Sequence, residues 1–258
     1  MELPFWSLKG LHVLMLLHKM KNLYQDILDS ISKNKKLLAV LIDPDKTTVE
    51  MAASFIEKVN KSVITHIFVG GSTVKEHVTN SLVSKIKSLS NLPVILFPGD
   101  VSQITKNADA LLFLSLISGR NPEYLIGKQV VAVSKLRKTN LEVIPTGYIL
   151  IENGKETSVQ KVTKTIPMSR KSIQAIVNTA KAGELLGMKL IYLEAGSGAL
   201  YPINDSIISS VKQELSIPLI VGGGIKSKVQ LDEAYNAGAD MVVVGTAFEE
   251  DESFFDEL

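Results

Sequence analysis

The chain of 258 residues contains no cysteine, and its charge is balanced, with 28 basic and 27 acidic residues and a formal net charge of +1. Without cysteine there are no disulfides, thiolate metal sites or cysteine nucleophiles, as is typical of a reducing cytoplasm, where we expect the protein to work. Without a concentrated basic patch, the chain is not expected to bind nucleic acid. The scattered histidines lack the spacing of a zinc site and are interpreted as solvated or locally hydrogen-bonded.

Long hydrophobic runs are also missing. No apolar run reaches the ~20 residues that a membrane span requires, and the run at residues 11–17 lacks the basic leader and cleavage site of a signal peptide. The sequence from Met20 onward reads like a native start. We therefore predict that residues 1–19 are an N-terminal extension, disordered or part of an extra helix, and that residues 20–258 form a single domain.

Eight short, β-branched and nearly uniformly apolar runs are present, as expected for buried parallel strands, and amphipathic stretches separate most of them. The runs cover residues 37–42, 65–69, 93–97, 110–116, 141–151, 190–194, 217–221 and 241–244. Eight such units in about 250 residues predict an α/β fold, a (β/α)8 TIM barrel, with a doubly wound open sheet as the alternative.

Two connections depart from a regular barrel. Only 12 residues, 98–109, separate the third and fourth runs. A helix with its turns hardly fits there, so we predict a modified barrel whose third helix is missing or degenerate. The polar segment 152–169 is interpreted as a long loop after the fifth strand, and loops of that length in compact domains are usually functional.

The sixth apolar run ends in a carboxylate and continues directly into a glycine–serine turn. Because strand residues alternate sides, Tyr192 and Glu194 share one face and Leu193 takes the other. Burying Glu194 is costly unless it serves a purpose at the strand's end. The turn Gly196-Ser197-Gly198 can bring backbone N–H groups close to an anion. This segment therefore predicts a catalytic base beside a phosphate cradle.

Two more glycine turns follow the seventh and eighth runs, at Gly222-Gly223-Gly224 and Gly245-Thr246. In TIM barrels these two turns form the usual phosphate site, because backbone donors at helix starts favour an anion. The pair therefore predicts a bound phosphate rather than two tight turns without a ligand.

The first strand ends in an acidic turn that contains Asp43 and Asp45. By alternation Asp43 points into the barrel. Together Asp43 and Asp45 form an acidic turn suited to Mg²⁺, which takes one or two carboxylates plus phosphate oxygens and water. Ser72, after the second strand, offers a neutral oxygen nearby. The alternatives are an ordinary turn that caps the next helix and, for Ser72, a helix N-cap. Arg120 and Asn121, after the fourth strand, either meet a second anion or form a surface turn.

No lysine ends a strand on the loop face in a position for a Schiff base. Lys189 precedes the sixth strand and therefore lies at the opposite end of the barrel. This argues against an aldolase.

Taken together, these motifs resemble the geranylgeranylglyceryl phosphate synthase family, which includes bacterial heptaprenylglyceryl phosphate synthases. The resemblance runs from about Leu23 to Phe248, and the motifs are most similar to those of the family's second group. The segments that carry it are Leu41-Ile42-Asp43-Pro44-Asp45-Lys46, Val69-Gly70-Gly71-Ser72, Phe97-Pro98-Gly99, Ser118-Gly119-Arg120-Asn121-Pro122, Pro145-Thr146-Gly147-Tyr148, Tyr192 to Gly198, Val221 to Ile225 and Val244-Gly245-Thr246.

The resemblance implies a TIM barrel without its third helix and Mg²⁺-dependent transfer of a long prenyl group, such as geranylgeranyl. The acceptor would be the 3-hydroxyl of sn-glycerol 1-phosphate, and the products diphosphate and an ether-lipid precursor for phospholipid biosynthesis. It implies Asp43 and Ser72 as metal ligands. It also implies a glycerol phosphate site made of Tyr192, Leu193, Glu194, Ala195, Gly196, Ser197, Gly198, Gly223, Gly224, Gly245 and Thr246.

For the chemistry we expect Glu194 to act as general base, with Tyr192 beside it. We also expect the protein to form a homo-oligomer, either a dimer or a larger ring. We expect transient contact with a membrane surface as well. The alternatives are another phosphate-binding barrel enzyme, such as a sugar-phosphate isomerase or lyase, and a non-catalytic binder of phosphometabolites. The first gives no reason for a metal-type aspartate combined with an apolar groove. The second does not explain Glu194, because a carboxylate facing the phosphate would repel an anion unless it is used for chemistry.

Overall fold

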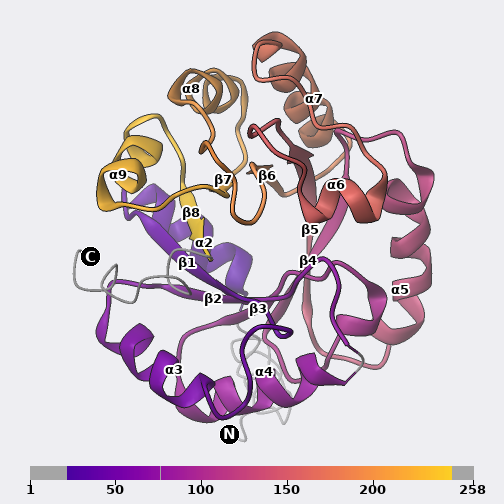
Figure 1. The fold of residues 1–258 in the computed structure, drawn as a ribbon, viewed down its shortest axis with the longest axis vertical. Helices are drawn as coiled ribbons and strands as arrows, with labels where there is room; N and C mark the ends of the chain where they lie inside the picture. Colours follow the sequence, from indigo (N-terminus) through magenta and orange to yellow (C-terminus); the bar gives the residue numbers. More distant parts are fainter. Residues whose placement is uncertain (1–21, 76, 246–258) are drawn as a thin grey trace, which may run out of the picture.

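The computed structural model describes residues 22–75 and 77–245. Eight parallel strands form a closed barrel in sequence order, and β8 closes it by pairing with β1 (Figure 1). The predicted barrel is confirmed, and the open sheet is excluded. The strands are β1 (Leu37–Ile42), β2 (His66–Val69), β3 (Val94–Leu96), β4 (Ala110–Leu116), β5 (Glu142–Leu150), β6 (Leu190–Glu194), β7 (Leu219–Gly222) and β8 (Met241–Val244).

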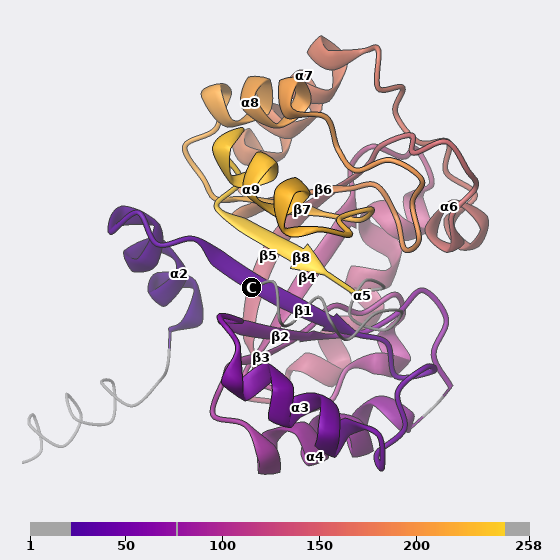
Figure 2. The ribbon, with the colours of Figure 1, turned by 60° about the vertical axis from the view of Figure 1, so that its left-hand side comes forward.

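Helices surround the barrel, and α2 lies beyond the end at which β1 begins (Figures 1 and 2). Leu23 and Ile27 of α2 pack into the barrel's inner core. The Glu142 carboxylate at the start of β5 accepts hydrogen bonds from the first two backbone amides of α2, at 2.5 and 3.1 Å. The helices are α2 (Leu23–Ser32), α3 (Ala52–Lys61), α4 (Val78–Leu89), α5 (Lys128–Leu136), α6 (Ser158–Thr163), α7 (Ile173–Leu185), α8 (Asp205–Glu214) and α9 (Lys228–Asn236).

The connection between β3 and β4 contains a single 3₁₀ turn, η1 (Val101–Gln103). The predicted loss of the third helix is therefore confirmed. After β4 a π-helical turn, η2 (Glu123–Gly127), leads into α5.

The segment 152–169 is not the continuous loop that we expected, because it contains the short helix α6. Thr157 starts this helix with a capping box, in which its side chain accepts from the Gln160 backbone and Gln160 reaches back. Ile151 also pairs with Met168 across the segment.

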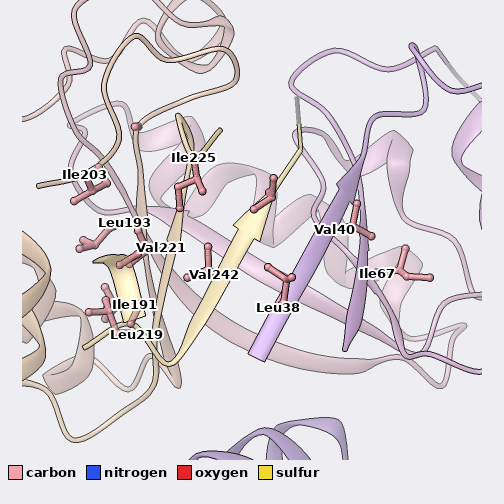
Figure 3. Close-up of a cluster of buried hydrophobic side chains, with 14 of the residues drawn as sticks. Leu38, Val40, Ile67, Ile191, Leu193, Ile203, Leu219, Val221, Ile225 and Val242 are labelled. Atoms are coloured by element: carbon pink, nitrogen blue, oxygen red, sulfur yellow. The ribbon is translucent and has the colours of Figure 1, made fainter. Parts of the chain in front are cut away.

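The strands separate two hydrophobic layers, as their alternation predicts. Leu38, Val40, Leu193 and Val221 belong to the outer cluster, which also contains residues of the surrounding helices such as Ile56 of α3 and Leu82 of α4. Figure 3 shows these four side chains on their strands. In contrast, Ala39 and Tyr192 belong to the inner cluster that fills the barrel. No helix in the described part of the chain is long and apolar enough to cross a bilayer. The predicted extension, residues 1–19, and Thr246 lie outside the described residues.

Candidate active site

A cavity of about 320 Å³ opens where the barrel strands end. Glycine turns after β6, β7 and β8 line one part of it, and apolar side chains from β4, η1 and α5 line another. Asp43 and Glu194 are carboxylates that also line it. The same cavity is thus lined by the backbone of glycine turns, by acidic side chains and by a hydrophobic groove.

Glu194 is the last residue of β6, and its side chain is only 5% exposed. The Gly196 backbone amide donates to its Oε1 at 2.5 Å, and the Tyr192 hydroxyl is a second hydrogen-bond partner. Burial raises the pKa of the Glu194 carboxyl to about 7, against the effect of these two hydrogen bonds. A carboxyl with such a pKa can exchange a proton near neutral pH, as a general base must.

The glycine turns approach one another so closely that side chains would not fit. A Cβ at Gly223, where φ is +84°, would lie 2.5 Å from Glu194 Oε1 and 2.6 Å from the Gly196 amide nitrogen. A Cβ at Gly224 would lie 2.9 Å from the Pro202 nitrogen. Ser197, Gly198 and Gly245 also line the cavity. The bare backbone of these turns suits an anion.

Two residues that the family resemblance assigned to glycerol phosphate do not present side chains to the cavity. Leu193 and Ala195 are fully buried in the outer, helix-facing core. The Ala195 backbone is engaged as well, because its N–H donates to Gly222 O at 3.0 Å and its carbonyl accepts from Asn153. Their side chains therefore support the turn from the core.

Asp43 and Ser72 both line the cavity, at the ends of β1 and β2. A Cβ at Gly71 would lie 2.8 Å from Asp43 Oδ1, so the glycine makes room for this carboxylate. Gln103 of η1 fixes Gly71 by donating to its carbonyl at 2.7 Å and accepting from its amide at 3.2 Å. One carboxylate and one hydroxyl fit Mg²⁺ if a substrate and water supply its other oxygens.

The rest of the acidic turn faces elsewhere. Asp45 is exposed, does not line the cavity and accepts from the Lys75 backbone amide at 3.1 Å. Across the described residues no cluster of three histidine, aspartate or glutamate side chains could hold a metal by itself. The ordinary turn at Asp43 is formed, because Asp43 Oδ1 accepts from the Asp45 amide at 3.0 Å. Neither Asp43 nor Ser72 caps a helix, however, because α3 and α4 begin after Met51 and His77.

Three aromatic rings line the cavity between the Asp43 and Glu194 sides. Phe97 stacks on Tyr192 with ring centroids 5.2 Å apart, and Tyr148 lies 5.4 Å from Tyr192 and 5.8 Å from Phe97. Burial, followed by the charge of Glu194, raises the pKa of both tyrosines well above its ordinary value. Their hydroxyl groups therefore stay protonated.

The groove extends between η1 and α5, where the third helix would otherwise pack. Leu111 belongs to the helix-facing layer and Phe113 packs against it. Both also line the cavity, because no helix of the described residues covers this part of the barrel. Its remaining apolar lining includes Val101, Ile104, Ala132, Val159 and Val162. Lys128 of α5 bridges to Asp100 before η1 at 2.6 Å, and both residues line the groove.

The second anion site suggested for Arg120 and Asn121 is not formed. Arg120 is exposed and donates to Gly119 O at 2.6 Å, and Asn121 donates to Thr163 O at 2.9 Å. Neither residue lines the cavity. The surface-turn interpretation is therefore the correct one.

Several residues that shape the site were given no role in the sequence analysis. Gln103, Asn153 and Thr157 brace the turns, and Phe97 and Tyr148 form the aromatic wall. The two aromatic residues carried a signal, because each lies at or near the end of a predicted strand. Nothing in the sequence pointed to Gln103, Asn153 and Thr157, because they act through tertiary contacts.

Comparison with known proteins agrees with this geometry. A sequence model described as the PcrB family matches residues 29–258. A geranylgeranylglyceryl phosphate synthase of Flavobacterium johnsoniae is 55% identical over 234 residues, which cover 91% of this chain and 96% of that protein. The corresponding Pyrococcus furiosus protein is 44% identical over 218 residues, or 84% of this chain and 86% of that one.

A solved structure is similar over nearly the same length. It is the (S)-3-O-geranylgeranylglyceryl phosphate synthase of Thermoplasma acidophilum in complex with its substrate sn-glycerol-1-phosphate. The TM-score is 0.86 at 34% identity, with 92% of this chain and 96% of that chain covered.

Proposed function

The chain belongs to the PcrB family, and from this premise we propose that it is a prenyltransferase that joins a geranylgeranyl group to sn-glycerol 1-phosphate. The donor is geranylgeranyl diphosphate, and the acceptor oxygen is the 3-hydroxyl of the glycerol. The observation that carries this proposal is the position of Glu194, a buried carboxyl between the glycine turns and an apolar groove.

The acceptor binds through its phosphate. Backbone amides of the glycine turns near Gly198 and Gly224 hold the phosphate, and hydrogen bonds to a charged group typically contribute roughly 1.5–3 kcal/mol each. With that end fixed, the far hydroxyl of the short glycerol points toward Glu194, which already shares a hydrogen bond with Gly196. Anchoring the phosphate thus orients the nucleophile.

In the reaction the glycerol oxygen bonds to C1 of the prenyl group as the bond from C1 to the diphosphate oxygen breaks. Glu194 accepts the hydroxyl proton, and diphosphate leaves with the bonding pair. Positive charge develops on the allylic carbon, and the aromatic rings of Phe97, Tyr148 and Tyr192, which line the cavity, can stabilise it. The Tyr192 hydroxyl, bonded to Glu194, keeps the carboxylate oriented.

Asp43 and Ser72 would hold Mg²⁺, which neutralises charge on the leaving diphosphate when it is bound. Gln103 supports this side of the site by fixing the backbone of Gly71, beside the Asp43 carboxylate. The prenyl tail occupies the groove between η1 and α5, whose lining is apolar.

The direct test is a turnover assay. The protein is incubated with Mg²⁺, sn-glycerol 1-phosphate and geranylgeranyl diphosphate, and the ether product is identified by mass spectrometry. sn-Glycerol 3-phosphate serves as the stereochemical control, and donors of 10 to about 35 carbons define the chain length. The absence of ether product with every donor would refute the proposal.

A further inference from the structure

Arg170 lies outside the cavity, between β5 and α7, yet it connects two loops that border the site. It donates to three backbone carbonyls: Glu152 O at 3.2 Å, Tyr201 O at 3.5 Å and Pro202 O at 2.5 Å. Its guanidinium also lies 5.9 Å from the centre of the Tyr201 ring. One side chain thus ties the segment after β5 to the loop between β6 and α8.

The loop that Arg170 holds is part of the proposed glycerol phosphate site. Gly196, Ser197 and Gly198 begin this loop, and Tyr201 and Pro202 end it. The end of the loop packs directly on the next glycine turn, because a Cβ at Gly224 would lie 2.9 Å from Pro202 N and 3.0 Å from Tyr201 C. A displacement of Tyr201 and Pro202 would therefore move Gly224 as well.

The start of the same loop is braced from the same side. Asn153 donates to the Ala195 carbonyl, and the Thr157 methyl group lies so close to Gly196 that a Cβ there would overlap it. Asn153 and Thr157 are both buried. The segment 152–170 thus supports the phosphate loop at its two ends, and Arg170 is the support at the distal end.

We infer that Arg170 is a positioning residue for the glycerol phosphate site, holding Tyr201 and Pro202 so that the turns at Gly198 and Gly224 keep the spacing that one phosphate requires. The inference rests on the proposed function. A planar guanidinium with five donors can serve three carbonyls at once. A lysine has one ammonium group and cannot span all three from one position.

The test compares Arg170→Ala and Arg170→Lys with Arg137→Ala, a control at an exposed arginine after α5 that does not line the cavity. We expect Arg170→Ala to raise the KM for sn-glycerol 1-phosphate about tenfold or more. The kcat and the KM for the prenyl diphosphate should stay within about twofold, because Arg170 touches neither the groove nor Glu194. Arg170→Lys should give an intermediate KM, and Arg137→Ala should match the wild type.

A second readout does not depend on turnover. Amide hydrogen exchange over residues 196–202 should accelerate in Arg170→Ala, and to a smaller extent in Arg170→Lys, while exchange in β1 and β2 stays unchanged. If Arg170→Ala does not fold, Arg170→Lys carries both measurements. Unchanged KM and unchanged exchange would overturn the inference, and so would a loss of kcat and of both substrate affinities in proportion to a loss of thermal stability.

Failure of the proposed function gives a different pattern. In that case the wild type itself makes no ether product. The exchange rates over residues 196–202, with calorimetric titration of sn-glycerol 1-phosphate, then decide whether Arg170 positions a phosphate site. Weaker titration and faster exchange in the variants support that role, and unchanged values overturn it.

Discussion

The Gly196 backbone amide donates to Glu194 Oε1 at 2.5 Å, so the first residue of the turn Gly196-Ser197-Gly198 is also a partner of the buried carboxyl. In the proposed mechanism this one hydrogen bond links acceptor binding to base chemistry. It also tends to lower the pKa of Glu194, but burial outweighs it and leaves that pKa at about 7. The titration of Glu194 therefore falls within the physiological range.

The first prediction concerns the pH dependence of the reaction. A general base works only when it is deprotonated, so kcat/KM should rise with pH up to about 7 and level off above it. Below pH 7 we expect a fall of about tenfold per pH unit. Initial rates between pH 5 and 9, with saturating Mg²⁺, measure this profile. A kcat/KM that stays flat from pH 5 to 8 would show that Glu194 does not act as the base.

The Glu194→Gln variant tests the same residue without changing its shape. We expect kcat to fall by about 10²–10⁴-fold. Affinity for sn-glycerol 1-phosphate should stay within a few-fold, because the amide oxygen can still accept from Gly196. Single-turnover rates and calorimetric titration separate the two effects. Turnover at the wild-type level would remove Glu194 from the chemistry.

The same variant should also alter how stability depends on pH. Since the pKa of Glu194 is 4.5 without burial and about 7 in the folded protein, the folded state retains a proton that the unfolded chain has lost between these values. Folded stability therefore decreases as pH rises from about 4.5 to 7, by on the order of 3 kcal/mol for this group. Glu194→Gln should lack this decrease, as urea unfolding at pH 5 and pH 8 would show.

Asp43 and Asp45 offer a matched pair for testing the metal site. They are two residues apart, but only Asp43 lines the cavity, while Asp45 is exposed and bonded to the Lys75 amide. We expect Asp43→Asn to weaken the apparent Mg²⁺ affinity in turnover by about tenfold or more, and Asp45→Asn to change it little. Mg²⁺ titration of activity, after chelation of the enzyme preparation, provides the measurement. Identical titration curves for Asp43→Asn and the wild type would rule out Asp43 as a ligand.

The success and failure of the sequence predictions have a common physical basis. Strand alternation and the geometry of a parallel barrel are periodic, so the opposite faces of Leu193 and Glu194 followed from spacing alone. The same regularity explains why the short connection between β3 and β4 predicted a missing helix. Residues at the C-terminal ends of the strands could therefore be assigned to the end of the barrel at which the cavity opens.

Contacts made by loops are not periodic, so they could not be predicted from the spacing of residues in the sequence. The polarity of residues 152–169 suggested a loop, but the Thr157–Gln160 capping box stabilises α6 within it. Arg120 looked suited to an anion, yet its guanidinium is turned onto the Gly119 carbonyl. In each case the outcome depends on a partner that becomes available only when the chain is folded.

The last prediction locates the wall that limits the prenyl group. Ala132 and Val133 are neighbours on α5, but Ala132 is buried and lines the groove, whereas Val133 is 39% exposed and does not line it. A phenylalanine at position 132 would extend into the space that we assign to the tail. We expect Ala132→Phe to lower kcat/KM for a 20-carbon donor about tenfold or more, while a 10-carbon donor is used within about twofold of the wild type.

Val133→Phe is the control, because it adds a ring to the same helix on the outer side. It should leave the preference between the two donors unchanged. The rates are measured with donors of 10, 15 and 20 carbons for both variants and the wild type. The ratio of kcat/KM for the 20-carbon donor to that for the 10-carbon donor then shows whether position 132 limits the length of the tail. An equal loss with every donor in Ala132→Phe would mean that α5 was merely distorted, and no loss at all would place the tail elsewhere than between η1 and α5.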